Sequence, residues 1–145
     1  MLNPDFREFL QSLNANGVRY LVVGGYAVAY YGHPRYTKDL DVWVEMSPRN
    51  AEGICAALEQ FGFGSLDLSP ADFLQANQVI QLGYPPARID ILMQADGVSF
   101  AECYAARVPV DLDGLTVTFI DLESLKANKR ASGRLQDLAD LEQLG

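Results

Sequence analysis

Two aspartates stand one residue apart in an otherwise apolar segment, Asp39-Leu-Asp-Val-Trp-Val-Glu45. Side chains alternate along a strand, so Asp39 and Asp41 point to one face of a sheet while Leu40 and Val42 face the core. Neighbouring carboxylates repel each other, which raises the pKa of one unless a cation intervenes. The pair is therefore either solvated at an exposed edge or arranged to hold a hard cation, usually Mg²⁺.

A third aspartate, Asp90, lies between two isoleucines in the core-like segment Arg88-Ile-Asp-Ile-Leu-Met93. A carboxylate in an apolar strand costs free energy unless it is paired or binds a metal. The alternative is a charge at a sheet edge that discourages aggregation. On a strand beside Asp39 and Asp41, Asp90 would complete a two-cation site for in-line phosphoryl transfer.

Gly24 and Gly25 follow the short apolar strand expected over residues 19–23 and precede a helix expected over 26–31. Glycines at such a junction let backbone amides approach a phosphate closely, with the positive end of the helix behind them. The alternative is a simple tight turn. The segment matches neither a dinucleotide-binding fingerprint nor a P-loop, because the further glycines and the Gly-Lys-Ser/Thr sequence are missing.

These residues need a framework of alternating helices and strands. Apolar periodicity and turn residues predict further strands over 39–45, 78–82, 88–93, 108–112 and 115–120, and further helices over 4–15, 48–61, 99–107, 122–130 and 135–144. We expect one α/β (α+β) domain over residues 1–145, with a mixed sheet of roughly five strands flanked by helices.

The composition limits the function classes. The chain has 145 residues, of which 49% are hydrophobic, and a net charge of −8, so broad binding to nucleic acid or to an anionic membrane is disfavoured. No apolar stretch approaches the ~20 residues that span a bilayer. The separated Cys55 and Cys103 indicate reduced thiols and a cytoplasmic protein, and a single histidine, His33, nearly excludes a Cys/His zinc site.

The order and spacing of these pieces resemble the DNA polymerase beta-like nucleotidyltransferase superfamily. Its signature is an apolar residue before two small residues, then an acid-x-acid strand, then a third acid on a neighbouring strand; Val23-Gly-Gly25, Asp39/Asp41 and Asp90 match it. The loop Arg35-Tyr-Thr-Lys-Asp-Leu-Asp41 looks like that of minimal prokaryotic members, among them abortive-infection type toxins and aminoglycoside nucleotidyltransferases. The segment 125–140 is similar to the Lys-rich closing helices of the toxin-like group.

The resemblance implies a role for each matching residue. Asp39 and Asp41 would ligate two Mg²⁺ ions, and Asp90 would ligate the ion that binds the acceptor hydroxyl and help to remove its proton. The residues implied to contact the nucleotide are Gly24, Gly25, Arg35, Thr37, Lys38, Lys126 and Lys129, with Asp137 as a partner that positions one of the lysines. For Lys126 and Lys129 the alternative is a cation that complements the negative end of a helix.

The expected function is that of a Mg²⁺-dependent nucleotidyltransferase, which moves a nucleoside monophosphate from an NTP to an acceptor hydroxyl on tRNA or protein, within a toxin–antitoxin system. The acidic surface argues against tRNA. The alternatives are transfer to a small molecule of the aminoglycoside type, and a non-catalytic module that binds a nucleotide or a partner. Because the chain has little room for a domain that grips the acceptor, we expect a homodimer or a partner subunit.

Overall fold

The computed structural model describes residues 2–32, 39–62, 67–83 and 88–145. Within these ranges the strands form one mixed sheet in the order β3-β4-β2-β1-β6-β5. Their bounds are β1 Tyr20–Val23, β2 Asp39–Val44, β3 Val79–Leu82, β4 Arg88–Leu92, β5 Val108–Leu112 and β6 Leu115–Phe119. The helices are α1 Pro4–Ala15, α2 Gly24–Tyr31, α3 Pro48–Phe61, the 3₁₀ helix η2 Pro70–Leu74, α4 Phe100–Ala105, α5 Leu122–Ser132 and α6 Leu135–Leu144.

The centre of the sheet combines both strand directions. β2 lies antiparallel to β1 and parallel to β4, and β1 lies parallel to β6. Two antiparallel hairpins, β3–β4 and β5–β6, form the two ends of the sheet. This arrangement places the two segments that carry aspartates, β2 and β4, side by side in the same direction.

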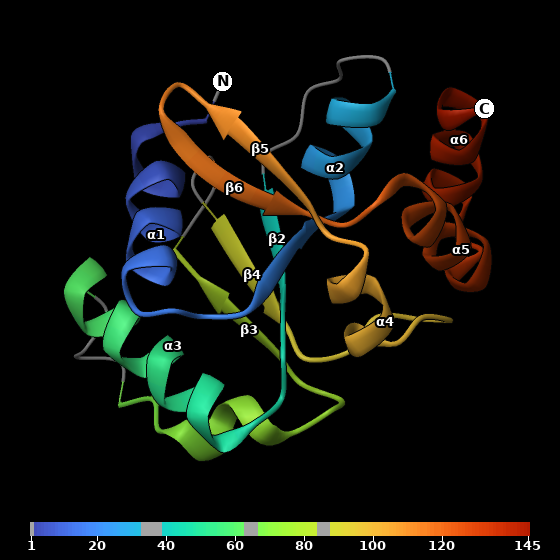
Figure 1. The fold of residues 1–145 in the computed structure, drawn as a ribbon. Helices are drawn as coiled ribbons and strands as arrows, with labels where there is room; N and C mark the ends of the chain where they lie inside the picture. Colours follow the sequence, from blue (N-terminus) through green and yellow to red (C-terminus); the bar gives the residue numbers. More distant parts are fainter. Residues whose placement is uncertain (1, 33–38, 63–66, 84–87) are drawn as a thin grey trace.

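One face of the sheet is covered by α1 and α3, which pack against each other (Figure 1). The α1 side chains that repeat at helical spacing are all buried: Phe6, Phe9, Leu10 and Leu13. Both helices begin at a residue whose side chain accepts a backbone N–H, Asn3 for α1 and Ser47 for α3, with proline at the start. Caps of this kind satisfy orphan donors at a helix N-terminus. These helices supply much of the apolar core, which also includes Cys103 of α4, Leu125 of α5 and Leu144 of α6.

The opposite face carries α4 and the closing helix pair α5–α6, which lies at one end of the molecule (Figure 1). Trp43 of β2 belongs to the same strand face as Asp39 and Asp41, because the side-chain period is two. Its indole meets the Phe100 ring of α4 edge-on, at 5.2 Å between centroids. The aspartates therefore lie on the face that α4 and α5–α6 only partly cover.

The α/β class and the mixed sheet with flanking helices are confirmed. The expected count of roughly five strands is corrected to six. β5 contains Pro109, which lacks a backbone donor, and it is accommodated as an edge strand that needs hydrogen bonds on one side only. Cys55 and Cys103 are free thiols. None of the helices in the described residues is long and apolar enough to span a membrane.

Candidate active site

The three predicted aspartates meet on adjacent strands. In the parallel β2–β4 pair Asp41 lies directly opposite Asp90, and Asp39 lies opposite Arg88. On the other side of β2, Val23 is the partner of Asp41, so the end of β1, directly before Gly24, adjoins the same row. The pairing follows from strand direction, since parallel strands in register bring equivalent positions to one level. The three carboxylates thus lie on one face of the sheet, in the first halves of the neighbouring strands β2 and β4.

Arg88 binds two of the three carboxylates. Its Nη2 lies 2.9 Å from Asp90 Oδ2 and 3.2 Å from Asp39 Oδ2, and its Nε donates to Asp90 Oδ1 over 3.1 Å. The guanidinium therefore bridges β2 and β4 between these carboxylates. Among the described residues no three Asp, Glu, His or Cys side chains are placed to hold a metal ion as they stand.

Asp41 is the carboxylate with the strongest electrostatic perturbation. Burial raises the pKa of Asp41 to about 7, and the neighbouring charges of Asp90 and Asp39 add to the effect. Lys129 and Arg88 act in the opposite direction without cancelling it. Asp41 is therefore held in a place where its negative charge is unfavourable until a further cation arrives.

Gly24 is required by the geometry beside Asp41. Its φ of +67° is a conformation that residues with a side chain rarely adopt, and a Cβ added here would overlap the Asp41 carboxylate. The helix α2 begins at this residue. The backbone of the turn thus approaches the carboxylate row closely.

A cleft of about 690 Å³ opens over the carboxylate row. Its lining includes Asp39, Asp41 and Asp90 from the sheet, Gly24 and Gly25 from the start of α2, and Lys129 from α5. Five of the predicted site residues and one predicted lysine therefore face a common space.

The two predicted lysines of α5 have different surroundings. Lys129 is buried and pairs with Asp137 at 3.0 Å and with Asp140 at 3.1 Å, both on α6. Lys126 does not line the cleft; its Nζ donates to the Gly145 carbonyl over 3.3 Å and lies 3.7 Å from Glu123. Of the two, the structure brings only Lys129 to the carboxylates.

Comparison with known proteins identifies the fold. No family model and no curated protein sequence matches this chain. Among solved structures, a proposed nucleotidyltransferase (TM1012) from Thermotoga maritima aligns with 16% identity and a TM-score of 0.61, over 99% of this chain and 92% of its own. An antigenic nucleotidyltransferase-like protein from Paracoccidioides brasiliensis aligns with 13% identity and a TM-score of 0.57, over 99% and 75%. This chain has the nucleotidyltransferase fold.

Three predicted site residues of this nucleotidyltransferase-like chain, Arg35, Thr37 and Lys38, lie outside the described residues. The sequence analysis did not predict two residues near the site: Arg88, which lines the cleft, and Asp140, which pairs with Lys129 without lining the cleft. Arg88 precedes Asp90 by two positions, so the strand period alone puts both on one face. Asp140 follows Asp137 by three positions, which places both on one helix face.

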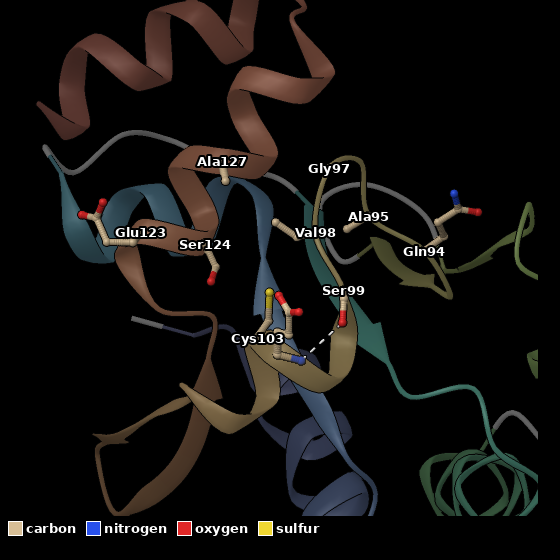
Figure 2. A pocket seen from close by; sticks show the side chains of 10 residues that line it. Gln94, Ala95, Gly97, Val98, Ser99, Cys103, Glu123, Ser124 and Ala127 are labelled. Atoms are coloured by element: carbon tan, nitrogen blue, oxygen red, sulfur yellow. Dashed lines mark hydrogen bonds between the residues drawn. The ribbon is translucent and has the colours of Figure 1, made fainter.

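A second cavity of about 690 Å³ adjoins the cleft of the nucleotidyltransferase fold and shares Gln94 and Ala95 with it. Figure 2 shows it between the segment 94–99, α4 and α5. Burial raises the pKa of the Cys103 thiol in this cavity, which favours the protonated form. The Glu123 carboxylate at its rim is mostly exposed, with the Lys126 ammonium 3.7 Å away. Among the described residues, the acids that line this cavity are Glu102 and Glu123, whereas five aspartates line the neighbouring cleft.

Proposed function

We propose that this protein is a nucleotidyltransferase that transfers a nucleoside monophosphate from an NTP to an acceptor hydroxyl. The observation that supports the proposal most directly is the in-register pairing of Asp41 with Asp90, with Asp39 on the same strand face and the Gly24 backbone against Asp41. An acceptor oxygen would form a bond to the α-phosphorus, and the bond between the α-phosphorus and the bridging oxygen would break, releasing pyrophosphate.

The residues present fit divalent cations. Asp39, Asp41 and Asp90 offer only carboxylate oxygens, the donors that Mg²⁺ prefers. The Arg88 guanidinium, which pairs with Asp39 and Asp90, supports this assignment because a cation already lies between two of the carboxylates. These three aspartates would hold two Mg²⁺ ions, which would neutralise phosphate charge and activate the acceptor oxygen when bound.

Other groups of the protein would bind the phosphates at one end of the carboxylate row and accept the acceptor's proton at the other end. Gly24 and Gly25 would donate backbone N–H groups to the phosphates at the β1 end, and Lys129 would add a positive charge there. Asp90 lies at the β4 end, on the far side of Asp41 from the glycines. It would accept the proton of the acceptor hydroxyl there.

The charge of the cleft bears on which acceptor the protein would use. Among the described residues, the cleft is lined by five carboxylates, Asp39, Asp41, Asp90, Asp96 and Asp137, against three cations, Arg88, Lys129 and Arg134. An excess of negative charge disfavours a polyanion, so we favour a protein or small-molecule acceptor over tRNA. A toxin–antitoxin role is supported by the resemblance of the loop and of the closing helices alone, and a second copy or partner subunit that completes the acceptor side stays a prediction from the sequence.

The test is pyrophosphate release from each of the four NTPs with Mg²⁺ in the presence of candidate acceptors. Asp41→Asn and Asp90→Asn should each lower the release by at least about a hundredfold, because each removes charge stabilisation at the reacting phosphate. Glu45→Gln, which changes an acid just beyond β2 that pairs with Arg19, is the matched control and should leave release intact. NTP binding without release for every acceptor would favour the non-catalytic module.

A further inference from the structure

The two edges of the sheet differ in how they are protected. β5, at one edge, contains Pro109, which lacks a backbone donor, and the exposed Asp111, and Arg7 of α1 donates to the Leu112 carbonyl over 3.0 Å. Proline and charged residues keep an edge strand from pairing with another chain. β3, at the other edge, spans Val79–Leu82 and has neither a proline nor a charged residue. Among the described strands, β3 is therefore the edge that is open to a further strand.

The position of β3 connects this open edge to the carboxylate cleft. One face of β3 packs on the apolar core, whereas Val79 and Gln81 on the other face line the cleft. Gln81 is the register partner of Asp90, and Asp90 is that of Asp41, so the three lie in one row across the sheet. Val79 is 50% exposed, which leaves an apolar surface uncovered at the rim of the cleft. A strand added beside β3 would become a wall of the cleft on the Asp90 side.

The charge of the cleft indicates what kind of strand would fit. Carboxylates outnumber cations among the described residues that line the cleft, and the whole chain has a net charge of −8. A second copy of this chain would bring further negative charge to the same edge, which disfavours pairing between copies. An extended segment of a basic protein offers both the backbone groups that pair with an edge strand and the opposite charge.

We propose that β3 docks an extended, basic segment of the acceptor protein, which pairs with its free edge as a further strand of the sheet. The inference rests on the proposed function and deepens it, because it names the class of acceptor and the surface that holds it. Neighbouring strands lie about 4.8 Å apart, so the docked segment would lie about 10 Å from β4. The acceptor hydroxyl therefore belongs to a long side chain or to the residues just beyond the docked stretch.

Selection of randomised peptides of about ten residues on the nucleotide-free protein tests the docking surface. Enriched peptides should be rich in Lys, Arg and β-branched residues. Val79→Lys should weaken their binding by about tenfold or more, because it removes an apolar contact and repels a basic peptide. Thr116→Lys, at an exposed position of the internal strand β6, is the matched control and should leave binding unchanged. Circular dichroism establishes that each variant is folded.

Backbone methylation of an enriched peptide distinguishes an added strand from a peptide held by its side chains. Along a strand the N–H groups point alternately to the two sides, so N-methylation of every second residue in one register should weaken binding by about tenfold or more. Methylation in the other register should have little effect. Magnetic resonance should show slower hydrogen exchange, when the peptide is bound, for the N–H groups of Val79–Leu82 that do not bond to β4.

The outcomes separate this inference from the proposed function. A failure to enrich basic peptides, equal effects of the two methylation registers, or a protein dimer that Val79→Lys dissociates would overturn the docking surface. Pyrophosphate release to a small-molecule acceptor that the enriched peptides do not inhibit would also overturn it and leave the transferase standing. A peptide that pairs with β3 in a protein that never releases pyrophosphate would support the docking surface while rejecting the transferase.

Discussion

Two clusters of charge face each other across the cleft, and they differ in balance. On the sheet, the three carboxylates of Asp39, Asp41 and Asp90 lie together, and the guanidinium of Arg88 bridges two of them, Asp39 and Asp90. On the closing helices, Asp137 and Asp140 are matched by Lys129 and Arg134. The sheet cluster has an excess of negative charge, and the helix cluster has none.

The pKa shifts follow this difference. Asp41 has its pKa raised to about 7 by burial and by the charges of Asp90 and Asp39. Burial would also raise the pKa of Asp137, but hydrogen bonds from Arg134 and Lys129 outweigh it and hold that pKa below the ordinary value. The sheet cluster, which has excess negative charge, can bind a further cation. The helix cluster, in which the charges are paired, instead holds its side chains in fixed positions. The comparison predicts opposite responses when each cluster is altered.

The largest effect is expected when the balanced cluster loses its central cation. Lys129→Met leaves Asp137 and Asp140 buried without their shared partner, so the free energy of unfolding should fall by about 3–5 kcal/mol. Urea denaturation measures this. Adding Asp137→Asn and Asp140→Asn to Lys129→Met should recover much of the loss, because the uncompensated charges are removed. A loss below about 1 kcal/mol for Lys129→Met would mean that the cluster is not buried in solution.

A smaller effect of opposite sign is expected in the sheet cluster. The folded pKa of Asp41, about 7, exceeds its ordinary value of 3.8, so the folded protein binds the proton more tightly than the unfolded chain does. Its contribution to stability is therefore complete below about pH 4 and is lost as the pH rises to about 7. Without divalent ions, Asp41→Asn should raise the free energy of unfolding at pH 8 by about 1–3 kcal/mol.

Thermal unfolding between pH 4 and pH 8 tests the predicted direction in which stability changes with pH. The stability of the wild-type chain should fall across this interval in chelator-treated buffer, and that of Asp41→Asn should fall less. Asp137 has a lowered pKa, so its contribution should instead be lost only as the pH falls below its ordinary value of 3.8. A destabilised Asp41→Asn at pH 8 would show that the sheet carboxylates are structural.

The sequence predicted the Asp39/Asp41 pair of the sheet cluster because that information is local, whereas the place of Asp90 beside them was predicted only through the resemblance. Alternation along one strand puts Asp39 and Asp41 on one face, and the glycine pair marks where a strand turns into a helix. The sequence did not show that Arg88 bridges Asp39 and Asp90, because strand order decides which side chains are neighbours.

The helix cluster was harder to predict because the local pattern there points the wrong way. Leucines at Leu135 and Leu138 favour an apolar buried face, yet α6 buries Asp137 and Asp140 and exposes these leucines. Burial of an acid depends on a cation from another helix, and helical periodicity contains no information on that partner. Asp137 was predicted as a partner for a lysine only through the resemblance, and Asp140 was missed.

The smallest effect expected concerns Arg88, the cationic side chain of the sheet cluster. If Arg88 occupies the place that divalent ions would take, Arg88→Gln should strengthen Mg²⁺ binding by about three- to tenfold, because one competing unit charge is removed from the row. Calorimetric titration of the nucleotide-free protein with Mg²⁺ measures the change. Arg19→Gln removes an exposed arginine that pairs with Glu45, and it should leave Mg²⁺ affinity unchanged. Weaker Mg²⁺ binding in Arg88→Gln would instead mean that Arg88 holds the carboxylates in place for the ions. In that case the geometry of the sheet cluster, like that of the helix cluster, would depend on a cationic side chain of the protein.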